Sequence, residues 1–313
     1  MEGVSVDVLT TSPVTGQVRG GVALRRWAVA SLAVNIIIVV TGGLVRLTDS
    51  GLGCPTWPRC SELSYVSHPE LGYHGAIEFG NRLLTFVLVA VAILTWLSAL
   101  RYRENGEPRV DLLRLTTIMA LGIPAQAVIG GLTVLSHLNP FVVAFHLLVS
   151  FALISVSVKL VRRTRGHLAL TVEPRTSALT RATFLLMWLA VWLGTVVTGS
   201  GPHAGDQVAV RTGFDPEFVS HVHAWAVYAT VAATLGCVVL LRSRAAVALL
   251  AVEVVQGTIG FGQYFNGLPI ALVALHLLGA ASALALATNL MLSVRSRAKP
   301  RPEPVALSPS SAP

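Results

Sequence analysis

The chain has 313 residues, of which 53% are hydrophobic and only 12% are charged, and its mean hydropathy is +0.69. Soluble globular domains carry about 25% charged residues, so this composition excludes a soluble globular fold. The net charge of +8 arises from basic residues whose positions follow a membrane topology, and it does not indicate a nucleic-acid-binding surface.

Uncharged windows define the expected membrane spans. About 20 apolar residues cross a bilayer, and two windows that are too long for one helix break at turn-forming residues, at 136–140 and 266–269. We therefore expect eight spans, over residues 27–45, 76–100, 112–134, 141–161, 182–200, 218–241, 245–263 and 269–293. The predicted fold class is an all-α, multi-pass protein of the cell membrane.

The basic residues predict how the spans are oriented. Nineteen of the 23 Lys and Arg residues lie before span 1, in every second connection, or after span 8. Because cytoplasmic loops are enriched in Lys and Arg, we expect both termini to be cytoplasmic. Residues 1–24 are then a cytoplasmic N-terminal segment, 166–181 a cytoplasmic linker, and 295–313 a disordered tail.

The sequence repeats itself at an offset of 130 residues. Gln126, Ile129-Gly130 and His146-Leu147-Leu148 match Gln256, Ile259-Gly260 and His276-Leu277-Leu278. The end of span 1, Thr41-Gly42, likewise matches the end of span 5, Thr198-Gly199. We expect two tandem four-helix bundles, over 25–165 and 182–294, that arose by internal duplication and share one orientation. The alternative is a chance likeness between apolar segments.

Polar residues inside the predicted spans are the candidate functional residues, because polar side chains are costly in a bilayer. They are Glu78, Asn81, Arg82, His146, His221, His223, Glu253 and His276. A single intramembrane His is most often a hydrogen-bonded structural residue. His223 and His276, however, fit the two axial ligands of a haem iron held between facing helices, whereas zinc would require three or four grouped ligands.

The first half retains only one of these two histidines. Its equivalent pair is Asn81 with His146, and Asn is a poor iron ligand, so we expect a permanent haem in the second half and a working site in the first. Glu78 and Arg82 share one helical face. They form either a structural ion pair or a site where Glu78 handles protons near His146. His74 is either an interfacial residue or a substitute ligand.

The predicted outer loops and the third cysteine complete the candidate residues. Cys54 and Cys60, with Gly and Pro nearby, are expected to form a disulfide in an oxidising compartment, as a structural staple or as a redox pair. Cys237 is expected to be a packing residue. The glycine-rich loop 199–206, which contains His203, either covers a haem edge or only connects two spans.

Taken together, these motifs resemble the haem A synthase family of membrane enzymes, which convert haem O into haem A for cytochrome oxidases. The resemblance covers residues 26–293. It is carried by residues 41–52, the pair Cys54 and Cys60, residues 77–82, residues 198–203, and His146, His223 and His276.

The resemblance implies that a methyl group of the porphyrin is oxidised to formyl. It implies haem b as a cofactor with its iron on His223 and His276, and haem O as the substrate with its iron on His146. In the same substrate site, Asn81 and Arg82 would contact the haem and Glu78 would be catalytic. A haem O synthase and a membrane electron donor are the implied protein partners. The family pattern has His where Asn81 stands, which leaves the second ligand of the substrate iron open.

Two other functions compete with this one. A b-type electron-transfer cytochrome without substrate chemistry predicts two histidines in each half, and Asn81 argues against it. A transporter or haem chaperone predicts charged or broken helices along a path through the membrane, and such helices are scarce here.

Overall fold

The computed structural model describes residues 18–166 and 169–297, and the long helices in these ranges number eight. They are α1 (Val18–Leu47), α2 (Gly72–Arg101), α3 (Val110–Leu135), α4 (Pro140–Thr164), α5 (Pro174–Ser200), α6 (Pro216–Leu241), α7 (Arg244–Phe265) and α8 (Ile270–Leu292). A short 3-10 turn, η1 (Pro69–Leu71), precedes α2. All eight helices are long and apolar enough to cross a membrane, so the predicted all-α multi-pass membrane fold is confirmed.

Two helices begin well before the predicted spans. α1 begins at residue 18 instead of 27, and α5 begins at residue 174 instead of 182. The prediction counted only uncharged residues, whereas Arg is a good helix former and a helix can continue beyond the bilayer. Pro174 occupies the first turn of α5, where its missing N–H costs nothing. Much of the predicted linker at 166–181 is therefore helical.

Short polar sequences start several of the helices. Asn139 precedes Pro140 and accepts a hydrogen bond from the Phe141 backbone N–H at 3.0 Å. Asp215 precedes Pro216 and caps α6 in the same way. Such caps satisfy backbone donors that have no partner inside the helix, and the cap at Asn139 lies where the sequence predicted a turn in the first long apolar window.

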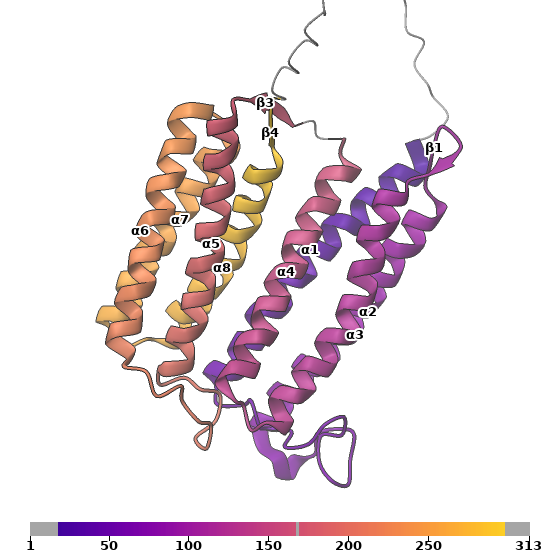
Figure 1. The fold of residues 1–313 in the computed structure, drawn as a ribbon. Helices are drawn as coiled ribbons and strands as arrows, with labels where there is room; N and C mark the ends of the chain where they lie inside the picture. Colours follow the sequence, from indigo (N-terminus) through magenta and orange to yellow (C-terminus); the bar gives the residue numbers. More distant parts are fainter. Residues whose placement is uncertain (1–17, 167–168, 298–313) are drawn as a thin grey trace, which may run out of the picture.

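The helices form two groups of four (Figure 1). In the first group, α1 contacts α2 and α4, and α3 contacts the same two helices. In the second group, α5 and α7 each contact α6 and α8 in the same cyclic order. Between the groups, α8 packs on α1 and α4, and α4 also packs on α5. The two groups therefore share one packing order, while the internal duplication itself stays a prediction.

The largest apolar cluster lies where the two groups meet. It includes Phe151 and Ile154 of α4, Val39 of α1, and Ala281 and Leu284 of α8, all buried. Small residues bring helices close together in membrane proteins, and α8 supplies several alanines to this contact. A partly buried hydrogen bond between hydroxyl side chains of α4 and α8, Ser155 and Thr288, adds a polar link at 3.2 Å.

The molecule has two distinct ends. At the basic end, α1 begins and α8 ends (Figure 1), and two small strand pairs lie outside the helices. β1 (Arg103–Glu104) pairs antiparallel with β2 (Glu107–Pro108), and β3 (Leu170–Val172) pairs in parallel with β4 (Val294–Ser296). The other end, called the loop end here, carries the long loops 48–68 and 201–215. The expectations for residues 1–17 and 298–313 lie outside the described residues.

Candidate functional site

His223 of α6 and His276 of α8 face each other inside the second group of helices. Their ring centroids are 6.4 Å apart and the rings are inclined at 78°. The Nδ1 atom of His223 lies 3.0 Å from the backbone oxygen of Ala190, so Nδ1 carries the proton and Nε2 is left as an electron-pair donor. Such a second hydrogen bond is the usual support of a metal-binding imidazole.

The spacing of the two rings fits one metal ion between them. Imidazole nitrogens bind a metal such as zinc at about 2 Å, so two nitrogens on opposite sides of one ion are about 4 Å apart. The ring centroids lie behind these nitrogens and are further apart, as the 6.4 Å here is. In the described residues there is no group of three or more His, Cys, Asp or Glu side chains that could hold a metal. The geometry therefore suits an ion with two protein ligands.

Each of the three inward histidines lies against a glycine of a neighbouring helix. A Cβ atom on Gly194 would be 3.4 Å from the His223 ring, one on Gly260 would be 3.6 Å from His276, and one on Gly130 would be 3.2 Å from His146. The pairs Gly130 with His146 and Gly260 with His276 occupy corresponding places in the two halves. Glycine at these places leaves room beside each ring.

The first half presents unpaired polar atoms at the predicted working site. His146 Nδ1 and Asn81 Oδ1 are buried and have no hydrogen-bond partner. Gln126 donates to the His146 backbone oxygen at 3.1 Å and to the Ser150 hydroxyl, while its own side-chain oxygen is also unpaired. Because buried polar groups are nearly always paired in native proteins, these atoms indicate a place for a bound group.

Glu78 and Arg82 form an ion pair, which is one of the two alternatives that the sequence left open, with 2.6 Å between Oε1 and the guanidinium. The other carboxylate oxygen of Glu78 accepts a hydrogen bond from the Cys54 backbone N–H at 2.6 Å. Arg82 also donates to the backbone oxygens of Cys54, Thr56 and Arg59. The pair therefore attaches the first loop to α2, a contact that the sequence did not reveal.

The first loop is closed by the predicted disulfide between Cys54 and Cys60, which is confirmed. Between the two cysteines, the Trp57 indole packs against Gly131 of α3 so closely that a Cβ on Gly131 would overlap it. Gly131 is next to Gly130, the glycine beside His146. The loop thus reaches the helix that borders the working site, and a tryptophan flanked by two cysteines was the available signal.

The remaining candidate residues lie apart from the paired histidines. His221 is exposed and is near Tyr264, with 6.2 Å between ring centroids. His74 Nδ1 hydrogen-bonds the Ser50 hydroxyl at 3.0 Å, and His203 Nε2 lies 2.9 Å from the Leu268 backbone oxygen. Cys237 is free and fully buried, as expected of a packing residue.

The loop that contains His203 connects the two halves at the loop end. Arg46, at the end of α1, donates from Nε to the His203 backbone oxygen at 2.6 Å and from its terminal nitrogen to the Thr198 oxygen at 2.8 Å. The Gly51 N–H also donates to the Gly205 oxygen at 2.8 Å. The glycine-rich loop is therefore part of the contact between the halves.

The fold and the site together define the class of this protein. It is a membrane protein with eight spans, and histidines face inward in both four-helix groups. The chain belongs to the COX15-CtaA family of cytochrome oxidase assembly proteins, whose model matches residues 25–71 and 66–288.

Three bacterial relatives, each named Heme A synthase, are similar to this chain. The protein of Lysinibacillus sphaericus is 32% identical over 148 residues, which are 46% of this chain and 47% of that protein. The protein of Shewanella oneidensis is 28% identical over 54% of this chain and 53% of its own length. This chain thus spans about half the length of these two relatives. The protein of Rhizorhabdus wittichii is 26% identical over 81% of this chain and 89% of its own length.

Proposed function

We propose that this protein is a haem A synthase, which oxidises a methyl group of haem O to formyl and so supplies haem A to cytochrome oxidase. Family membership and the names of the relatives support this function. The observation that carries it is the facing pair His223 and His276, together with the single histidine His146 at the corresponding place in the other half.

In this proposal the second half binds haem b, with its iron on His223 and His276. The donor set supports this because the two rings face each other, and His223 keeps Nδ1 on a backbone oxygen. His276 Nδ1 is buried without a partner. When bound there, haem b would supply one-electron redox chemistry in an apolar pocket. The protein's own contribution is to fix the two rings and to exclude water.

The first half binds the substrate haem O through its iron on His146. Asn81 occupies the place that His223 holds in the second half, and as a weak ligand it leaves the substrate iron more accessible on that side. Glu78 handles protons at the mouth of this site, between α2 and the disulfide loop. Arg82 holds the Glu78 carboxylate in place, and its remaining N–H donor is available to a propionate of the substrate.

The two halves, residues 25–165 and 182–294, then have separate tasks in one membrane orientation. The concentration of Arg and Lys at the basic end supports cytoplasmic termini. The disulfide loop at the opposite end would face an oxidising compartment, as a stable disulfide requires.

The test is haem A formation in a host that has a haem O synthase but no haem A synthase of its own. We expect cells that express the chain to contain haem A, detected by chromatography of extracted haems. Glu78→Gln should abolish haem A while the low-spin haem spectrum of the purified protein stays unchanged. Glu70→Gln is the matched control, because Glu70 is a highly exposed glutamate near the start of α2. A low-spin haem spectrum without any haem A from the unmodified chain would instead support a b-type cytochrome.

A further inference from the structure

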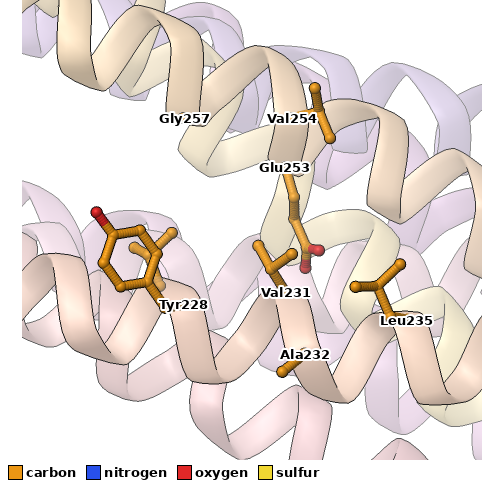
Figure 2. A pocket seen from close by; sticks show the side chains of 8 residues that line it. Tyr228, Val231, Ala232, Leu235, Glu253, Val254 and Gly257 are labelled. Atoms are coloured by element: carbon orange, nitrogen blue, oxygen red, sulfur yellow. The ribbon is translucent and has the colours of Figure 1, made fainter.

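A groove lies between α6 and α7 in the second half, and the paired histidines are not among the residues that line it. Its volume is about 380 Å³. Its walls are formed mainly by Tyr228, Val231 and Leu235 of α6, and by Val254 and Gly257 of α7. Figure 2 shows the Glu253 side chain extending from α7 toward α6, with its carboxylate between Val231 and Leu235.

Glu253 is the one acidic residue among the groove residues, and one of its two carboxylate oxygens has no hydrogen-bond partner. The residue is only 5% exposed. Oε1 accepts a hydrogen bond from the Thr234 hydroxyl at 2.9 Å, whereas Oε2 is buried and accepts none. A buried acceptor without a donor is destabilising, so the groove lacks a hydrogen-bond donor that belongs beside Oε2.

The missing donor must come from the lipid phase. Glu253 follows the first residue of α7 by nine positions, which is about 13 Å along the helix axis, so it lies within the hydrocarbon region. The groove walls around it are apolar except for Tyr228, and that hydroxyl makes no hydrogen bond to the carboxylate. At the register that aligns His146 with His276, the first half has Ile123 in place of Glu253, so the feature is specific to the second half.

We propose that this groove binds the head group of an isoprenoid hydroquinone dissolved in the membrane. Such a head is a flat apolar ring with O–H donors, one of which would pair with Glu253 Oε2 while the ring packs against Val231 and Val254. Phospholipids have charged heads that remain at the membrane surface, so they do not bring a donor to this depth. The proposal goes beyond the proposed function and does not depend on it, because neither the paired histidines nor Glu78 lines the groove.

The experiment measures ligand binding to the purified full-length protein in phosphatidylcholine nanodiscs. Calorimetric titration compares decylubiquinol, its oxidised form decylubiquinone, and decanol. We expect saturable binding of decylubiquinol at one molecule per chain. The oxidised form and decanol should bind about tenfold more weakly, because the oxidised ring offers no donor and the alcohol offers no ring to pack in the groove.

Two variants test the role of the groove residues. In Glu253→Gln the remaining oxygen stays with Thr234 and the new amide N–H faces the groove, so decylubiquinol should bind about tenfold more weakly and the preference for the reduced form should disappear. Val231→Trp fills the groove and should abolish binding. The control Val239→Trp adds the same bulk on α6 at a site that is 69% exposed and should leave affinity unchanged.

Three results would overturn the proposal. They are an absence of saturable decylubiquinol binding, equal binding of decanol, and an unchanged affinity and redox preference in Glu253→Gln. Because Glu253→Gln nearly conserves size, the test remains decisive even if Val231→Trp does not fold. Loss of haem A formation would not affect the outcome, since binding is measured directly.

Discussion

Arg82→Ala should release the disulfide loop from α2. The substitution removes the ion pair with Glu78 and the hydrogen bonds to three backbone oxygens of the loop, those of Cys54, Thr56 and Arg59. Glu78 would keep only the Cys54 N–H as a donor. Its carboxylate would then be an incompletely paired charge in a largely buried place.

The expected cost follows from the burial of the pair. The Glu78 side chain is 7% exposed and the Arg82 side chain 21% exposed, and removing one partner of a buried ion pair costs about 3–5 kcal/mol. We expect the lower end, about 3 kcal/mol, because the loop keeps its disulfide and the Trp57 contact with Gly131. At 1.4 kcal/mol for each factor of ten, this raises the open fraction of the loop by about a hundredfold.

The reduction rate of the Cys54–Cys60 disulfide reports this opening. Wild-type and variant proteins are treated with dithiothreitol under native conditions, and the free thiols are alkylated and counted by mass spectrometry. We expect about hundredfold faster reduction in Arg82→Ala. The double variant Arg82→Ala with Glu78→Gln should be reduced more slowly than the single variant, because it leaves no unpaired charge.

An ion pair at the other end of the molecule provides the control. Arg109 pairs with Glu104 and Asp111, and the hydrogen bond to Asp111 raises the pKa of Arg109 above its ordinary value. Both acidic partners are exposed, and surface pairs contribute about 0–1 kcal/mol. Arg109→Ala should leave disulfide reduction unchanged. A reduction rate in Arg82→Ala close to that of wild type would refute the role assigned to the buried pair.

Three further predictions concern the haem sites and the loop. Replacement of His223 or His276 by Ala should remove the low-spin haem b from the purified protein, measured by the absorption spectrum of the reduced form, and an unchanged spectrum in both variants would contradict the assigned ligands. Asn81→His should convert the substrate haem toward six-coordinate low-spin iron and slow haem A formation; if spectrum and rate both stay the same, the open side is not required. Gly131→Ala should displace the Trp57 indole and destabilise the protein by about 1–3 kcal/mol, as overpacking does, and thermal unfolding that matches wild type would exclude this close contact.

Much of the architecture was predictable because it depends on the positions of charged residues and of turn-forming residues, which can be read directly from the sequence. Charge-free windows gave all eight spans, and the turn residues near Pro140 and Pro269 divided the two long windows correctly. The ends of α1 and α5 were missed because helix propensity continues past the bilayer, where charges no longer oppose it. The disulfide was predictable because only Cys54 and Cys60 share a loop.

The candidate site was predictable only in part. The approach of His223 and His276 was predicted because both are histidines inside predicted spans of the same half, which requires no knowledge of side-chain packing. The link from Glu78 to the Cys54 N–H depends on the path of an irregular loop, and no helical or strand periodicity describes such a path. The groove at Glu253 was likewise hidden, because a sequence shows a polar residue in a span but not which of its atoms lack partners.

The parallel pairing of β3 with β4 has a consequence for how the chain can be produced. β3 precedes α5 and β4 follows α8, so the polypeptide enters and leaves the second half at adjacent backbone segments. In this strand pair Leu170 is the partner of Val294, and Val172 is the partner of Ser296. A chain interrupted between residues 166 and 169 would keep this pairing within one fragment. The two halves would still share the apolar contact of α8 with α1 and α4. Translation as two separate polypeptides is therefore compatible with the complete eight-helix assembly.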